Sequence, residues 1–301
     1  MNEPPDTLAG MNADTDADLP RGIALAWGVA AHPQRGPRRE LSLEGIVDAA
    51  VSIADASGLG AVSMSSVSTA LGFTTMSLYR YVSAKDDLIL LMQELGIGLP
   101  PLSIAEATTW REGLTRWHRA ILEMYAAHPW LLDIPMDSEP STPNNLAWLD
   151  AGLAVLAETP LDAAARVDSL LLVSGHSRYV AQIIRNQDGP PLPLATLAEL
   201  ITPEQFPYLA PALAAGAFSP EGGGAFEFGL MRILDGLERH IAELGAGRPG
   251  TTSAPDPDLA FRKDDRIKKV REQIKGAEEK LRDLRKKERE ILASLRHKAI
   301  S

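Results

Sequence analysis

One stretch of the chain decides the fold: residues 63–92 read SMSSVSTALGFTTMSLYRYVSAKDDLILLM. Ser63 is a good N-cap for a short helix, and Gly72 allows the tight turn that ends it. A second short helix spans Met76 to Val82, with Thr74 or Thr75 as the residue that starts it. Its core positions are Leu78 and Val82. Two short helices joined at a glycine are typical of a helix-turn-helix, in which the second helix enters the major groove of DNA.

A longer helix is expected on each side of this pair. Ser42 caps the first, whose apolar residues follow helical spacing until Gly58. Ser83 and Asp86 form a capping-box-like pair that opens the second, which continues through Leu95. The sequence therefore predicts a small helical head over residues 41–98.

This head closely resembles the TetR family of transcriptional regulators. The family pattern has a helix begun by threonine or serine, a leucine-glycine turn and a recognition helix reading Ser-Leu-Tyr-x-Tyr/His-Val/Phe, then a lysine and an acidic-leucine stretch. Residues 42–64, SLEGIVDAAVSIADASGLGAVSM, also resemble the family's first helix. The resemblance implies a three-helix DNA-binding domain that recognises a double-stranded operator.

The resemblance also assigns roles by motif position. Residues of the recognition helix would meet the operator, the lysine would hold a phosphate, and residues at the first two helix starts would lie near the DNA backbone. These DNA-binding candidates are Ser42, Met64, Ser65, Ser66, Thr74, Thr75, Ser77, Tyr79, Tyr81 and Lys85. For Tyr79, partial packing in the head core is an alternative that its hydroxyl could combine with a DNA contact.

One departure from the family pattern concerns charge. Many relatives carry arginines where this chain has Ser65 and Ser66, so phosphate contacts are lost and the salt dependence of DNA binding should be shallower. Arg35, Arg38 and Arg39 could restore such contacts from a flexible arm, or could simply belong to a solvated linker. Residues 1–40 are otherwise acidic and rich in small residues, and are predicted to be a disordered tail.

Residues 102–245, after Pro100-Pro101, carry longer helical patterns that predict an all-α bundle. The expected elements are a helix from Trp110 that ends at His128-Pro129, a turn over 130–134, a helix capped by Asn145 and stopped at Pro160, a long helix opened by Asp162, a stretch over 203–218, and a last helix containing Phe226 to Ile241.

This second region resembles the ligand-binding domain of the tetracycline-repressor branch, in which a helix ending in His-Pro-Trp-Leu and a terminal FEFGLxRxLDG helix recur. The resemblance implies a homodimer built by residues 162–187 and 223–244, and a pocket lined by the middle helices. Large apolar side chains with a few polar groups suit such a pocket, although each could instead pack the core. The candidates are Trp117, His118, Ile121, Tyr125, Trp148, His176, Tyr179 and Phe206.

No catalytic or metal site is expected. Gly175-His176-Ser177 hints at a nucleophile elbow, but Tyr179 stands where the second glycine is required. The triple glycine 222–224 lacks the lysine of a phosphate-binding loop. An isolated histidine on a helix is more often structural than a ligand, so His118 and His176 predict no metal, and nothing indicates a cofactor.

The C-terminal part differs in composition from the rest. Residues 246–260 are a linker by composition, and residues 261–301 hold 15 Lys and Arg against 8 Asp and Glu. Apolar residues there alternate spacings of three and four, as in a coiled coil. Positions on this seam are Ile267, Val270, Ile274, Ala277, Leu281, Leu284, Ile291 and Leu295, with a polar break at Glu288. A coiled-coil hairpin or a strut between subunits fits the pattern, and so does a basic helix that touches DNA or the acidic body.

Global composition sets the remaining limits. The chain has 301 residues, a net charge of −10 and no cysteine, which excludes disulfides and fits a reducing cytoplasm. No apolar run approaches the roughly 20 residues that span a bilayer, and Ile23–Ala31 follows an acidic segment where an export signal needs bases. We therefore expect a cytoplasmic, ligand-responsive regulator, a repressor released by a small hydrophobic effector. The alternative is a protein-interaction module that acts through its coiled coil.

Overall fold

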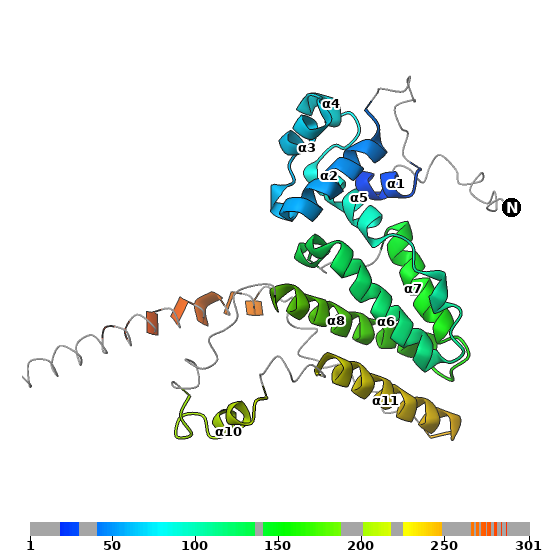
Figure 1. Cartoon of the computed structure of the whole chain (residues 1–301), viewed down its shortest axis with the longest axis vertical. Helices are drawn as coiled ribbons and strands as arrows, with labels where there is room; N and C mark the ends of the chain where they lie inside the picture. The colour runs from blue at the N-terminus through cyan, green and yellow to red at the C-terminus, as the bar shows by residue number, and fades with distance from the viewer. Residues whose placement is uncertain are drawn as a thin grey trace, which may run out of the picture. The chain divides into compact units, whose positions relative to one another are not determined.

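The computed structural model describes residues 19–29, 41–135, 141–187, 201–217 and 225–248, and a scattered set between 266 and 287. Regular secondary structure in this described part is entirely helical, as the sequence predicted. The chain forms two compact units, residues 1–248 and 249–301. The first unit holds the head and the body together (Figure 1).

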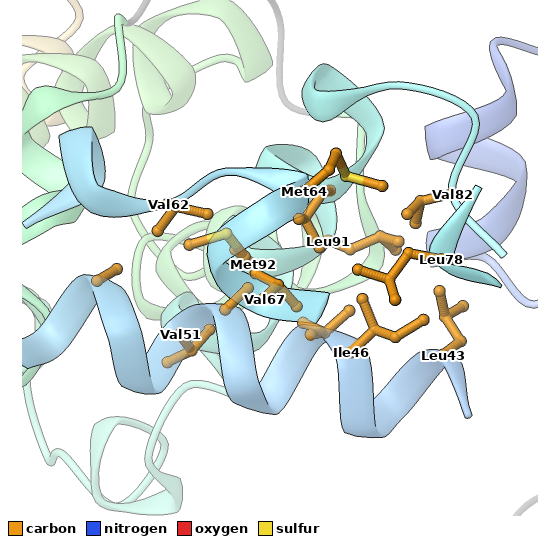
Figure 2. Close-up of a cluster of buried hydrophobic side chains, with 14 of the residues drawn as sticks. Leu43, Ile46, Val51, Val62, Met64, Val67, Leu78, Val82, Leu91 and Met92 are labelled. Atoms are coloured by element: carbon orange, nitrogen blue, oxygen red, sulfur yellow. The ribbon is translucent and has the colours of Figure 1, made fainter. Parts of the chain in front are cut away.

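The head contains four helices in the predicted order: α2 (Leu43–Ser57), α3 (Met64–Leu71), α4 (Thr75–Leu78) and α5 (Lys85–Ile97), with a 3-10 turn η2 (Leu59–Ala61) after α2. Ser42 caps α2 by accepting a hydrogen bond from the Gly45 amide at 3.0 Å. Gly72 ends α3 in the left-handed region at φ 75°, where a side chain would be strained. Apolar residues of all four helices and of the connections between them meet in one core (Figure 2).

Two details of the head differ from expectation. Helix α4 ends at Leu78 rather than Val82, and the chain continues in a turn, although Leu78 and Val82 are both fully buried as predicted. The predicted Ser83–Asp86 capping pair is wrong, because the N-cap of α5 is Ala84, whose side chain has no acceptor. Asp86 and Asp87 still place negative charge in the first turn, where the helix dipole favours it.

A helix also forms inside the segment that was predicted to be a disordered tail. Helix α1 (Arg21–Ala26) packs against α5, with Ala24 and Leu25 buried, so that part of the prediction is wrong. Leu25 belongs to the head core, which gives this short apolar segment a surface to cover. Arg35, Arg38 and Arg39 lie outside the described residues.

The body comprises η3 (Leu102–Ile104), α6 (Trp110–Ala127), η4 (Pro129–Asp133), α7 (Pro143–Val155), α8 (Ala163–Gln187), α10 (Leu209–Ala214) and α11 (Ala225–Gly245). Helix α8 follows Asp162, whose carboxylate accepts from the Ala165 amide at 2.8 Å, as expected of its cap. Asn145 is not the N-cap of α7: Thr142 holds that position and Pro143 is the first helical residue, which proline favours. The predicted stretch over 203–218 is helical only at α10, and Phe218 lies outside the described residues.

Helix α7 packs closely against α6 and α8 at two glycines. A Cβ added at Gly113 of α6 would lie 2.6 Å from Cγ1 of Val155 on α7, and one at Gly152 of α7 would lie 2.7 Å from Cδ2 of Leu170 on α8. Real Cβ atoms do not approach other atoms so closely, so a side chain at Gly113 or Gly152 would force Val155 or Leu170 to move.

The second unit is helical at its described positions between Arg266 and Lys287. Of the predicted seam, Val270, Ile274, Leu281 and Leu284 are exposed in the single chain. Ile291, Leu295 and the polar break at Glu288 lie outside the described residues, as does most of the linker.

Candidate functional site

Helix α4 presents a polar surface at its N-terminus. Thr74 caps the helix, its hydroxyl accepting from the Ser77 amide at 3.3 Å and lying 2.8 Å from the Ser77 hydroxyl. Thr75 is half-buried, and its hydroxyl lies 3.3 Å from that of Ser68 on α3. Both hydroxyls are therefore held in place by neighbours and retain capacity for a further hydrogen bond.

The two tyrosines that follow have different surroundings. Tyr79 is 44% exposed and is absent from the residues that pack against the head core. Tyr81 packs against that core, and its hydroxyl donates to the carbonyl of Leu41. The expectation that Tyr81 faces the operator is therefore not supported, because its hydroxyl already ties the end of the recognition segment to the start of α2.

The starts of α2, α3 and α5 supply the remaining candidates. Ser65 and Lys85 are exposed, and Ser42 is half-buried. Met64 is only 7% exposed, so its side chain lies in the head core and not at the surface (Figure 2). Ser66 forms a capping box with Ser63, since each side chain accepts from the other's amide at 2.9–3.0 Å. Ser66 therefore stabilises α3 rather than projecting outward.

Two exposed apolar residues beside α4 escaped the sequence prediction. Met76, on α4 itself, is 75% exposed, and Phe73, in the turn before it, is 41% exposed. Because Leu78 is buried, a helical wheel places Met76 on the opposite side of α4, so the position could have been identified from the sequence. In a helix that enters the major groove, apolar side chains can contact the methyl group of thymine.

A cavity of about 320 Å³ lies in the body. Four of the predicted ligand residues line it: Trp117, Ile121, Tyr125 and Trp148. Trp117 donates its indole N–H to the Trp148 carbonyl at 3.1 Å, and Trp148 donates to the Gly98 carbonyl at 3.0 Å. With both N–H groups satisfied, the indoles offer apolar surface to a bound molecule. The two indole rings pack edge to face, with their centroids 6.5 Å apart.

The polar part of the cavity wall was not predicted. Its members are Gln93, Ser141, Thr142, Asn145, Ser174 and Arg178. Their spacing carries no motif, so only the folded arrangement of α5, α7 and α8 brings them together. The wall thus combines aromatic surface with a few hydrogen-bonding groups, as small-molecule sites do.

The other four predicted ligand residues do not line this cavity. His118 is 8% exposed, and its Nδ1 lies 2.7 Å from the Ser177 hydroxyl. The His118 ring stacks on that of His176, with centroids 5.6 Å apart. Burial, with the neighbouring His176 and Arg119, lowers the pKa of His118 to about 4. Tyr179 and Phe206 are exposed, at 62% and 44%.

The segment that hinted at a nucleophile elbow lies within helix α8. Ser177 is fully buried there, and its hydroxyl donates to the Val173 carbonyl at 2.7 Å, so it is a core residue. In the part of the chain that the structure describes, no three His, Asp or Glu side chains gather as metal ligands would. None of the described helices combines the length and the apolar character that crossing a membrane requires.

Helix α5 connects the head to the cavity. Leu88, Leu91 and Met92 lie in the head core, whereas Leu90, Gln93 and Ile97 line the cavity. A molecule in the cavity that displaced α5 would therefore also displace α2, α3 and α4, because these helices share one core with α5.

Known proteins resemble this chain both in the body alone and over most of its length. Residues 104–241 match the family described as "Tetracyclin repressor-like, C-terminal domain". The HTH-type transcriptional repressor DrrR1 of Streptomyces coeruleorubidus is 32% identical over 242 residues, 75% of this chain and 88% of that protein. The structure of ActR from Streptomyces coelicolor in complex with actinorhodin is 26% identical, with a TM-score of 0.58 over 67% of this chain and 99% of that one. A possible TetR family regulator from the same organism is 28% identical, with a TM-score of 0.52 over 64% and 97%.

Proposed function

Because the chain belongs to the TetR family of transcriptional regulators, we propose that it is a repressor that binds a palindromic operator as a homodimer and is released by a small molecule. The observation that carries this proposal is the double role of α5, which supplies both the head core and a wall of the cavity. Helix α4 would enter the major groove, with Thr74, Thr75 and Tyr79 toward the bases.

An exposed apolar face on α8 and α11 supports the dimer. Leu172 and Tyr179 of α8 are 58% and 62% exposed, and Phe228 of α11 is 64% exposed. Gly175 lies between the first two along one face of α8, and a Cβ there would meet no other atom within 4 Å. Such a face suits a second copy of the same two helices, because burial of this apolar surface drives association.

Release would follow from the geometry of two linked heads. The recognition helices of a dimer must lie about 34–36 Å apart to enter successive major grooves. A ligand that binds better to a state with a different separation lowers operator affinity, typically by about 1–3 kcal/mol of coupling. Two findings about relatives support this proposal: DrrR1 is a repressor, and ActR was solved in complex with actinorhodin.

The proposal is tested with the purified full chain and labelled DNA from the regions flanking its own gene. Fluorescence anisotropy should show saturable binding to one of these fragments that is at least about a thousandfold tighter than to a scrambled duplex. Equal affinity for both DNAs at every salt concentration would contradict the proposal.

One observation favours a second activity. The exposed seam residues Val270, Ile274, Leu281 and Leu284 need a partner, since a helix this charged is stable mainly when its apolar seam is packed. The simplest partner is the same segment of the second subunit, which would form a strut between the two tails of a dimer. The alternative partner is a different protein. Deletion of residues 261–301 should leave operator binding intact and lower the thermal stability, whereas loss of DNA binding with the dimer preserved would indicate a basic helix that contacts DNA.

A further inference from the structure

Arg178 has unusual surroundings for an arginine in the cavity wall. It lies on α8, is half-buried, and donates to the carbonyls of Leu132 and Ile134 at 2.7 and 2.8 Å. Longer contacts of 3.3 and 3.4 Å join it to the Tyr125 hydroxyl and the Leu131 carbonyl. Every one of these acceptors is neutral, so the guanidinium charge is solvated by dipoles rather than neutralised.

Other arginines of the body are paired differently. Arg111, Arg116 and Arg185 each bind a carboxylate, with N–O distances of 2.5–3.0 Å. Among the described residues, no carboxylate forms an ion pair with Arg178. The described lining of the cavity contains no Asp or Glu at all, and Arg178 is its one charged member. Among the described lining residues, the positive charge of Arg178 therefore has no counter-ion.

Physical chemistry indicates what such a cavity binds. A partly desolvated guanidinium attracts an anion far more strongly than one in water, because the local dielectric constant is low. Nη2 of Arg178 is held by the Leu132 and Ile134 carbonyls, but the two contacts of Nη1, at 3.3 and 3.4 Å, are long, so Nη1 can turn its donors to a carboxylate oxygen. Charge-assisted hydrogen bonds are about twice as strong as neutral ones. Ser174 lines the cavity one helical turn before Arg178 and offers a further donor to the same group. Trp117 and Trp148 supply the apolar surface.

We propose that the effector of this cavity is an aromatic acid: a flat apolar body that lies against Trp117 and Trp148, with a carboxylate or ionised phenol bound by Arg178. This inference rests on the proposed function only in calling the ligand an effector, since it concerns binding to the cavity itself. A neutral or cationic molecule of the same shape would leave the Arg178 charge without a counter-ion.

Two matched probes test the proposal directly. Anthraquinone-2-carboxylate and anthraquinone-2-carboxamide share one ring system and differ in charge at neutral pH. Their binding to the full chain, without DNA, is measured by calorimetry and by quenching of tryptophan fluorescence. The carboxylate should bind about tenfold more tightly or better, equivalent to about 1.4 kcal/mol. Equal binding, tighter binding of the amide, or binding of neither overturns the proposal.

Variants locate the preference at one side chain. Arg178→Gln should lower the affinity for the carboxylate to that for the amide, whereas Arg178→Lys should retain part of the preference because the charge remains. Arg185→Gln is the matched control, since Arg185 pairs with Asp133 and is not part of the described cavity lining. An unchanged preference in Arg178→Gln overturns the assignment, and if that variant does not fold, the wild-type preference and Arg178→Lys decide. Failure of operator binding would leave this result standing, because no DNA is present.

Discussion

Asn144 and Glu94 join the first turn of α7 to α5 through two hydrogen bonds of 2.8 Å. The Glu94 carboxylate accepts from the Asn144 backbone amide, and the Asn144 side-chain amide donates to the Glu94 carbonyl. Since α7 contributes Asn145 and Trp148 to the cavity and α5 reaches into the head core, this pair connects the two functional parts of the molecule. A carboxylate at a helix N-terminus also interacts favourably with the helix dipole.

The Glu94–Asn144 pair predicts a stability difference between two variants. Glu94→Ala leaves a helix amide without its acceptor and should lower the free energy of unfolding by about 1–3 kcal/mol, whereas Asn144→Ala removes one hydrogen bond and should cost about 1 kcal/mol. Guanidinium denaturation measures both. Glu123→Ala, an exposed position on α6, is the control and should change stability by less than about 0.5 kcal/mol. If Glu94→Ala behaves like this control, the pair does not hold α7 to α5.

Tyr79 and Tyr81 should respond in opposite ways to truncation. Tyr79→Ala should weaken operator binding with little change in stability, because the ring is exposed and does not pack on the core. Tyr81→Ala should destabilise the head by about 3 kcal/mol, since it loses both core packing and the hydrogen bond to Leu41. Thermal unfolding and DNA anisotropy on the same preparations separate the two effects. Unfolding of the head by Tyr79→Ala would show that this ring is a core residue.

Ser65 and Ser66 offer a matched test of the missing phosphate contacts. Ser65→Arg should tighten binding to all duplexes and steepen the slope of log affinity against log salt by about one unit per added contact, because Ser65 is exposed. Ser66→Arg breaks the capping box and should instead lower the stability of the head by about 1 kcal/mol. An unchanged salt slope in Ser65→Arg would show that the start of α3 does not face the DNA backbone.

Burial of His118 predicts a pH dependence of stability. Folding depresses its pKa from 6.5 to about 4, so the unfolded chain holds the proton more tightly. The stability that the neutral ring contributes is therefore complete above about pH 6.5 and is lost as the pH falls toward 4, by up to about 3 kcal/mol. The free energy of unfolding of wild type and of His118→Gln is measured by denaturation at pH 7 and pH 5. The difference between the two losses isolates the contribution of His118, because all other groups titrate in both proteins. Equal losses in the two proteins would contradict the assignment.

The sequence predicted best where local rules decide the structure. Ser42, Ser63 and Gly72 mark helix ends through their own side chains or backbone freedom, and the structure has them at those ends. Leu78 and Val82 are both buried as predicted, although Val82 lies in the turn after α4 and not in the helix. At α7 the start also follows a local rule, because Pro143 is the first helical residue, a position that proline favours, and Thr142 takes the N-cap position predicted for Asn145.

Tertiary packing decided what the sequence could not predict. Helix α1 is too short to be stable alone and forms against α5, so no local pattern reveals it. Trp117 and Trp148 line the cavity while His118 and Tyr179 do not, although all four lie on helices of the same bundle. Arg178 is the clearest case: its proposed role depends on a described cavity lining that holds no Asp or Glu, and this lining is visible only after folding.

If two copies of α4 read one operator, a hydroxyl-radical footprint of the full chain on the DNA fragment that it binds should show both contacts. We expect two protected half-sites related by an inverted repeat, with centres one helical turn or a whole number of turns apart, about 10–10.5 base pairs per turn. Tyr79→Ala should lose protection of both half-sites together. A single protected half-site, or protection spread evenly along the fragment, would show that the chain does not bind its operator through two copies of α4.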